Sequence, residues 1–119
     1  MFKDLYDSLT FSEKLHLWRM RKEWTIAEAA KYFDVSFDTY SHWEKGRNSP
    51  QKQQPYKVTS NIDPATIKEY EWYRLLRRRN KIEIKELARL SGISRNWIAQ
   101  SERGQVGLER LRTYWEGRF

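Results

Sequence analysis

Residues 74–104 of the chain have the sequence RLLRRRNKIEIKELARLSGISRNWIAQSERG. Apolar residues recur at helical spacing on both sides of Gly92, which suits a left-handed turn because it has no Cβ. Ile93 is expected to anchor that turn, and Ser94 to cap the helix that follows. Gly104 marks where this helix should end. The stretch therefore predicts two short helices joined by a tight turn.

The same pattern occurs once earlier in the chain. A shift of 58 residues aligns residues 15–47 with 73–105 without a gap, and nine of the 33 paired positions are identical. The identical pairs are Leu17/Leu75, Arg19/Arg77, Arg21/Arg79, Ile26/Ile84, Glu28/Glu86, Ala30/Ala88, Ser36/Ser94, Glu44/Glu102 and Gly46/Gly104. A repeat of this length indicates a duplicated supersecondary unit, since it keeps residues at the turn, the cap and the helix end.

Two capping boxes begin helices in the first copy. Thr10–Glu13 and Thr25–Glu28 each place a Glu three residues after a Thr, so that each side chain can satisfy a free backbone amide. They predict helices that end near Lys22 and Phe33. Asp34, which tolerates a left-handed conformation better than most residues, is expected at the next turn. Ser36 and Gly46 then delimit a third helix.

The remaining segments are predicted from composition and cap signals. A short helix is expected over residues 1–9. Residues 47–61 are polar, with two Pro and several Gln and Ser, which favours a linker or extended loop; the linker is placed at residues 51–62. Asp63-Pro64 predicts the start of a long helix that runs to about Asn80. Apolar residues at positions 108, 111 and 115 predict a closing helix.

Several of these segments resemble the Xre/Cro-repressor-like helix-turn-helix family. The resemblance is carried by residues 24–30, 35–36, 43–47 and Pro50, and in the second copy by residues 86–88, 92–95 and 102–104. It implies an all-α fold of two tandem lambda-repressor-like helix-turn-helix bundles. Residues 1–50 would form one, 51–62 the linker, and 63–119 the other. It also implies a sequence-specific regulator of transcription that binds duplex DNA, commonly as a homodimer and commonly as a repressor.

The resemblance also assigns roles to single residues. Structural ion pairs are expected between Arg19 and Glu44 and between Arg77 and Glu102. In the second copy, the expected base-reading residues are Arg95, Asn96, Ala99 and Gln100. The corresponding residues of the first copy are Phe37, Asp38, Ser41 and His42. Arg suits guanine, Asn and Gln suit adenine, and Ala can meet a thymine methyl group, so the second copy is expected to be the main reader.

The net charge of +7 favours an acidic partner such as nucleic acid. The charge is uneven: residues 1–60 carry ten basic against eight acidic residues, and residues 61–119 carry thirteen against eight. The basic residues expected to contact phosphate are Arg74, Arg78, Arg79, Lys81, Lys85, Arg89, Arg103, Lys45 and Arg47. Because the first half is nearly neutral, it could instead touch only the DNA backbone, support the other copy, or bind a protein.

Other chemistry finds little support in the sequence. The chain has no Cys and two His, and neither His has a carboxylate at metal-ligand spacing, so no metal or other cofactor is expected. No catalytic set or phosphate-binding loop occurs, so the chain is not expected to be an enzyme. Neither a signal peptide nor a membrane span is indicated, and a cytoplasmic location is expected. The rival hypothesis is a protein-interaction module that binds another regulator or RNA polymerase.

Overall fold

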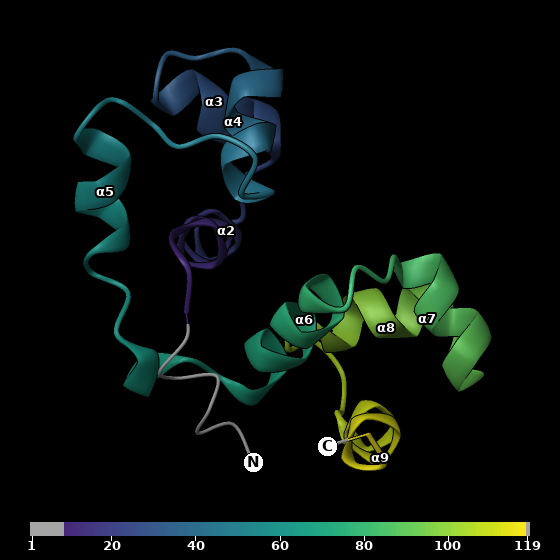
Figure 1. Ribbon diagram of the computed structural model, residues 1–119. Helices are drawn as coiled ribbons and strands as arrows, with labels where there is room; N and C mark the ends of the chain where they lie inside the picture. The colour runs from purple at the N-terminus through teal and green to yellow at the C-terminus, as the bar shows by residue number, and fades with distance from the viewer. Residues whose placement is uncertain (1–8, 119) are drawn as a thin grey trace. The chain divides into compact units, whose positions relative to one another are not determined.

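The computed structural model describes residues 9–118. They form eight α-helices and one 3₁₀ helix, and no strand occurs in this range (Figure 1). The elements are α2 (Phe11–Arg21), α3 (Ile26–Tyr32), α4 (Phe37–Glu44), α5 (Gln54–Thr59), η1 (Pro64–Thr66), α6 (Glu69–Arg79), α7 (Ile84–Ser91), α8 (Arg95–Ser101) and α9 (Glu109–Glu116). The expected all-α class is therefore confirmed. The helix expected over residues 1–9 falls on residues 1–8, outside the described residues.

The described chain divides into two compact units between Thr66 and Ile67. The N-terminal unit (residues 9–66) holds α2 to α5 and η1, and the C-terminal unit (residues 67–118) holds α6 to α9. Each unit contains one complete copy of the sequence repeat.

Local capping fixes the helix starts of the N-terminal unit. The Thr10 hydroxyl accepts a hydrogen bond from the Glu13 amide at 3.2 Å, and the Glu13 carboxylate accepts one from the Thr10 amide at 2.9 Å. Thr25 and Glu28 repeat this arrangement at 3.1 and 3.0 Å. Both predicted capping boxes are therefore confirmed, and each satisfies amides that a helix start leaves unpaired.

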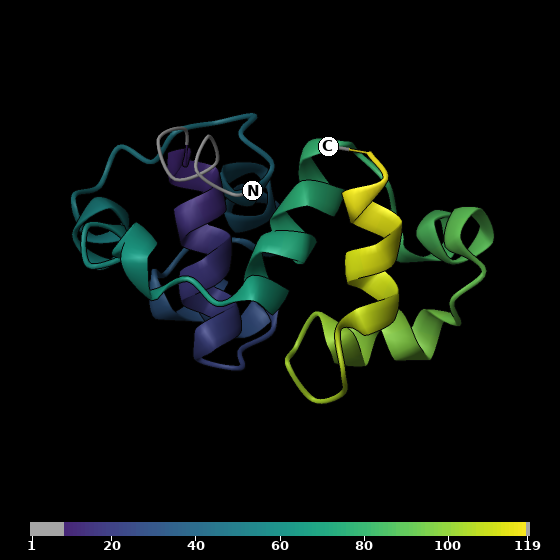
Figure 2. The same ribbon diagram turned by 90° about the horizontal axis from the view of Figure 1, so that it is seen from below.

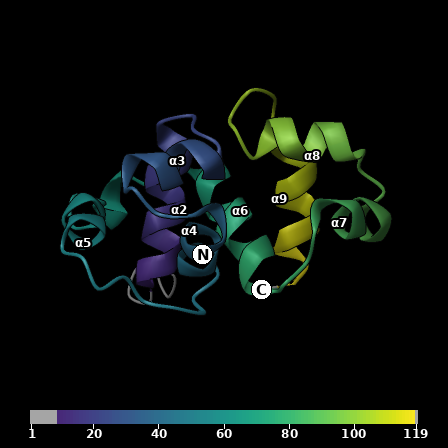
Figure 3. The ribbon, with the colours of Figure 1, turned by 90° about the horizontal axis from the view of Figure 1, so that it is seen from above.

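Helix α2 is the central element of the N-terminal unit. It packs against α4 and α5, and α3 packs against α4; Figure 3 shows α5 beside α2. Aromatic side chains fill much of the space between α2, α3 and α4, where Phe33 and Tyr40 stack with ring centroids 6.0 Å apart. The buried apolar residues of these three helices and their turns are Leu15, Leu17, Trp18, Ala29, Ala30, Phe33, Tyr40 and Trp43.

Helix α5 corrects the expectation of an extended linker. Residues 54–59 are helical, and Pro55 lies in the first turn, where its missing amide hydrogen costs nothing. Pro55 and Thr59 are buried, and the Phe11 ring of α2 lies 4.7 Å from the ring of Tyr56. The segment is helical because one side of it packs on α2, which composition alone does not reveal.

The expectation of one long helix from Asp63 to about Asn80 is wrong. The Asp63 carboxylate accepts a hydrogen bond from the Ala65 amide at 3.0 Å, which favours the short 3₁₀ helix η1. The backbone is extended at Lys68, with ψ of 157°, and α6 begins only at Glu69. Glu71 accepts a hydrogen bond from the Lys68 amide at 2.9 Å and so caps the new helix start.

In the C-terminal unit, α7 and α8 pack against each other and are joined at Gly92, which has a φ of +76°. The expected closing helix is present as α9, which lies beside α6 in Figure 2. Arg112 of α9 donates to both carboxylate oxygens of Glu69 in α6, at 2.9 and 2.8 Å. The buried apolar residues of this unit are Ile67, Trp72, Tyr73, Leu75, Leu76, Leu87, Ile93, Ile98, Leu111 and Trp115.

Candidate nucleic-acid interface

Helix α8 presents one accessible face. The Ser94 hydroxyl accepts a hydrogen bond from the Trp97 amide at 3.2 Å and so begins the helix. Ile98 and Ser101 are fully buried and hold the inner side of the helix against the core. The expected base-reading residues lie one turn apart on the other side: Arg95 and Asn96 are exposed, and Ala99 and Gln100 are partly exposed. Their positions fit a helix that offers this side to a groove.

Helix α4 presents a different set of side chains. Phe37 is 53% exposed, Asp38 is exposed, and His42 is partly exposed. Ser41 is only 7% exposed, which corrects the expectation that it reads a base. The matching residue of the C-terminal unit, Ala99, remains partly exposed.

Arg74 is not available for a phosphate. It is 4% exposed, and its Nη1 donates to the backbone carbonyl of Glu102 at 2.8 Å. Burial lowers the pKa of the Arg74 guanidinium to about 10. The structure therefore corrects the expectation that Arg74 contacts DNA: its guanidinium ties α6 to the end of α8.

The other phosphate candidates lie at or near the surface. Arg78 and Arg79 are partly exposed, and the exposed residues are Lys81, Lys85, Arg89, Arg103, Lys45 and Arg47. Lys85 lies 3.9 Å from a Glu83 carboxylate oxygen, and Arg89 lies 3.7 Å from one of Glu86. Such solvent-exposed pairs are weak, so phosphate can compete with these carboxylates for the two side chains.

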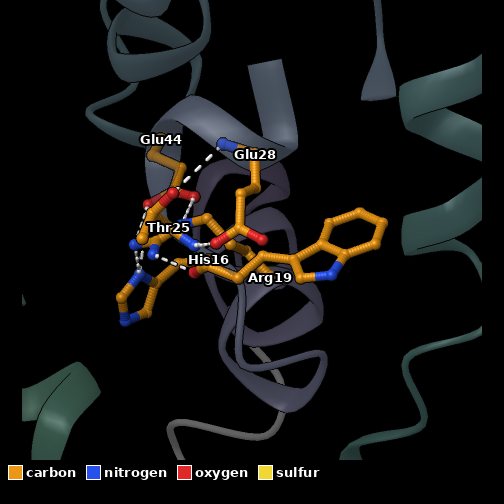
Figure 4. Close-up of polar contacts among 6 residues, drawn as sticks. His16, Arg19, Thr25, Glu28 and Glu44 are labelled. Carbon is orange, nitrogen blue, oxygen red and sulfur yellow. Dashed lines mark hydrogen bonds and ion pairs between the residues drawn. The ribbon is translucent and has the colours of Figure 1, made fainter. Parts of the chain in front are cut away.

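A buried ionic network supports α4. Arg19 Nε lies 2.6 Å from Glu44 Oε2, and Arg19 Nη1 donates to the Trp24 carbonyl at 2.9 Å. His16 Nδ1 lies 3.1 Å from Glu44 Oε1 (Figure 4). Burial alone would raise the pKa of the Glu44 carboxyl, but His16 and Arg19 outweigh it and hold that pKa well below its ordinary value of 4.5.

The C-terminal unit repeats this network at the same positions. Arg77 Nε lies 2.8 Å from Glu102 Oε2, and Arg77 Nη1 donates to the Ile82 carbonyl at 3.0 Å. The paired residues, and the carbonyl that each arginine reaches, are 58 residues apart in the two units. Arg74 takes the place of His16. Sequence reasoning missed both of these network residues, because a His and an Arg on a helix are usually exposed and nothing local indicates their burial.

The backbone follows the same register. Helix α2 shifted by 58 residues coincides with α6, and the first residues of α3 and α4 coincide with those of α7 and α8. Three pairs of residues with positive φ are also 58 apart: Glu23/Lys81 at 58° and 56°, Asp34/Gly92 at 56° and 76°, and Gly46/Gly104 at 73° and 76°. Residues other than glycine rarely adopt a positive φ. The recurrence of three such positions at one spacing shows that the corresponding turns of the two units have the same backbone conformation.

The described residues offer neither a metal site nor a membrane-spanning helix. Between residues 9 and 118, no group of three His, Cys, Asp or Glu side chains is placed to hold a metal ion. No helix of that range is both long and apolar enough to cross a membrane.

Comparison with known proteins supports a helix-turn-helix assignment for part of the chain. A family model described as helix-turn-helix matches residues 15–54, about a third of the chain. The match begins within α2 and ends at the first residue of α5, so it covers the N-terminal copy of the repeat. It suggests a DNA-binding regulator of transcription. Comparison with curated proteins and with solved structures gives no match.

Proposed function

We propose that the chain is a sequence-specific, duplex-DNA-binding regulator of transcription with two tandem helix-turn-helix units. One lies within residues 1–50 and the other within residues 63–119, and the protein acts as a repressor by occupying its site. The observation that carries this proposal is the shared 58-residue register of helices, left-handed turns and buried ion pairs. Because the two copies share this register, the match to the helix-turn-helix family over residues 15–54 supports the same assignment for residues 73–105.

Helix α8 is the main reader in this proposal. Its accessible face carries Arg95, Asn96 and Gln100, which can form bidentate hydrogen bonds with guanine or adenine. Exposed cations, including Lys81 and Arg103, lie in the same unit and suit phosphate oxygens. Two readers in one chain favour a DNA site with two parts, since a duplex presents the same groove again about 34 Å further on.

Helices α3 and α7, the second helix of each copy of the repeat, differ in the charged side chains at their starts. In α3, the Glu28 carboxylate accepts from the Thr25 amide, so a negative charge already occupies the helix start. In α7 the N-cap residue is Glu83, and its side chain makes no capping hydrogen bond. The first turn of α7 also holds Glu86, so its start is no less negative than that of α3. The stronger DNA binding proposed for the C-terminal unit rests instead on its exposed cations, Lys81, Lys85, Arg89 and Arg103.

Selection of bound duplexes from a random pool, using the full chain, tests this function. We expect one enriched sequence, and binding that weakens steeply as salt rises. Asn96→Ala and Gln100→Ala should each relax the preference at one position, because each removes a side chain that reads a base. Thr113→Ala, on the exposed side of α9, is the matched control. Binding without any preferred sequence would contradict the proposal.

A second candidate function is a protein-interaction module in the N-terminal unit. It is favoured by Phe37, a large apolar side chain that is 53% exposed at the start of α4, next to the acidic Asp38. Phe37→Ala distinguishes the two. If it leaves both the affinity and the sequence preference for DNA unchanged, Phe37 does not read a base, and binding to another regulator or RNA polymerase becomes the better explanation for this exposed ring. Sedimentation of the free chain would show whether it forms a homodimer.

A further inference from the structure

The chain turns back beside α4 immediately after that helix ends. Gly46 has a φ of +73°, and the next amide, that of Arg47, donates to the His42 carbonyl at 3.0 Å. This reversal brings Asn48 alongside the last turn of α4. There the Asn48 side-chain nitrogen, Nδ2, lies 3.4 Å from His42 Nδ1. Asn48 is exposed and His42 is partly exposed, so both can reach a ligand at the surface.

The contact favours one position for the imidazole proton. The Asn48 Nδ2 atom bears two hydrogens and no acceptor lone pair, so this contact is a hydrogen bond when His42 Nδ1 is the acceptor. A neutral imidazole has one N–H, which then lies on Nε2. In that tautomer His42 is a hydrogen-bond donor at Nε2. The same kind of control by a partner on the other ring nitrogen is known for histidines that act as metal ligands or catalysts.

The C-terminal unit shows why such a partner is needed only in the N-terminal unit. Gly104 makes the same reversal, and the Gln105 amide donates to the Gln100 carbonyl at 2.9 Å. The residue that corresponds to Asn48 is Val106, which has no polar side-chain atom. Gln100 corresponds to His42, and its amide always offers both a donor and an acceptor, so it requires no partner to define them.

We propose that Asn48 is a positioning residue that holds His42 as the Nε2–H tautomer, so that His42 donates a hydrogen bond to an acceptor on a base edge. Guanine O6 and N7, adenine N7 and thymine O4 are the acceptors available in the major groove. This inference rests on the proposed DNA-binding function and deepens it, because it gives α4 a specific polar contact and adds a residue outside the helix to the reading surface.

The tautomer is tested first in the absence of DNA, by the nitrogen NMR signals of the full chain above the pH range in which histidine titrates. The chain has two histidines, so the signals that disappear in His42→Ala belong to His42. We expect an Nε2–H imidazole in the intact protein and a mixture in Asn48→Ala. In Asn48→Asp the carboxylate accepts from Nδ1–H, so the proton should move to Nδ1. Identical His42 signals in all three proteins would overturn the proposal.

The reading role is tested by duplex selection with the same proteins. Asn48→Ala and His42→Ala should lose preference at the same base pair, by about 5-fold, which corresponds to one hydrogen bond of ~1 kcal/mol. The double variant should lose no more than His42→Ala alone, and Ser49→Ala should match the intact protein. If the intact chain has a preferred sequence but Asn48→Ala keeps it unchanged, the inference fails. If the intact chain has no preferred sequence, the proposed function itself fails.

Discussion

Arg19 donates two hydrogen bonds to the Glu44 carboxylate, from Nε to Oε2 at 2.6 Å and from Nη2 to Oε1 at 3.0 Å. The pair joins the last turn of α2 to the last residue of α4. Because α4 is anchored in this way, the exposed residues at its start keep a fixed orientation. The Arg77–Glu102 pair connects α6 to the end of α8 in the same manner, at 2.8 and 2.9 Å.

We expect Arg19→Ala to lower the free energy of unfolding by about 3 kcal/mol, because Glu44 would remain as a buried carboxylate that has lost its main cationic partner. Urea denaturation monitored by tryptophan fluorescence measures this change. Lys45→Ala is the matched control, since Lys45 is exposed next to Glu44 and its loss should alter stability by less than about 0.5 kcal/mol. An Arg19→Ala variant as stable as this control would show that the pair contributes nothing.

Acid should weaken the intact protein through Glu44. Its pKa is lowered in the folded state, so its contribution to stability is fully present above the ordinary value of 4.5 and declines as the pH falls below that value towards the folded pKa. Glu44→Gln removes this titration. We expect the stability difference between the intact protein and the variant to be largest near neutral pH and to shrink in acid. Urea titrations at a series of pH values measure it, and a difference that does not vary with pH would contradict the assignment.

Two glycines with the same φ of +76° should differ in their tolerance of alanine. A Cβ at Gly104 would lie 2.8 Å from Cε1 of the Tyr70 ring, whereas a Cβ at Gly92 would have no neighbour within 4 Å. Gly92→Ala should cost about 1 kcal/mol from backbone strain alone. Gly104→Ala should cost more, and Tyr70→Ala should remove the excess in a double variant. Thermal unfolding of the intact protein, the three single variants and the Gly104→Ala/Tyr70→Ala double variant checks this. Equal losses of stability for the two single glycine variants would show that the Tyr70 ring moves away freely.

Features set by a few neighbouring residues could be predicted from the sequence. Thr25 and Glu28 are three residues apart, so their capping box follows from spacing, and Ser94 and Gly92 define their turn in the same local way. The side of α8 that faces outward also follows from sequence, because Ile98 must turn inward. The helix α5 could not be predicted in this way, since its stability comes from burial of Pro55 and Thr59.

Charged residues inside the fold were harder to predict than the turns. Arg74 lies in a run of basic residues that resembles a solvated helix face, yet it is 4% exposed. Ser41 is also polar and also buried, with 7% of its surface exposed. Whether such a residue faces outward depends on the packing of elements distant in sequence, which composition and periodicity describe only on average.

The difference between a buried and an exposed arginine should appear in the salt dependence of DNA binding. Arg103→Gln should reduce the slope of log affinity against log salt by about 0.9, the value for one lost phosphate contact, because Arg103 is exposed. Arg74→Met should leave the slope unchanged. It should also lower the free energy of unfolding by about 1–3 kcal/mol, because Met can fill the same space but the buried Glu102 carbonyl loses the hydrogen bond that Arg74 Nη1 donates at 2.8 Å. Duplex-binding titrations over a range of salt, together with urea denaturation of both variants, measure these effects. A reduced slope for Arg74→Met in a stably folded variant would show that Arg74 reaches phosphate after all.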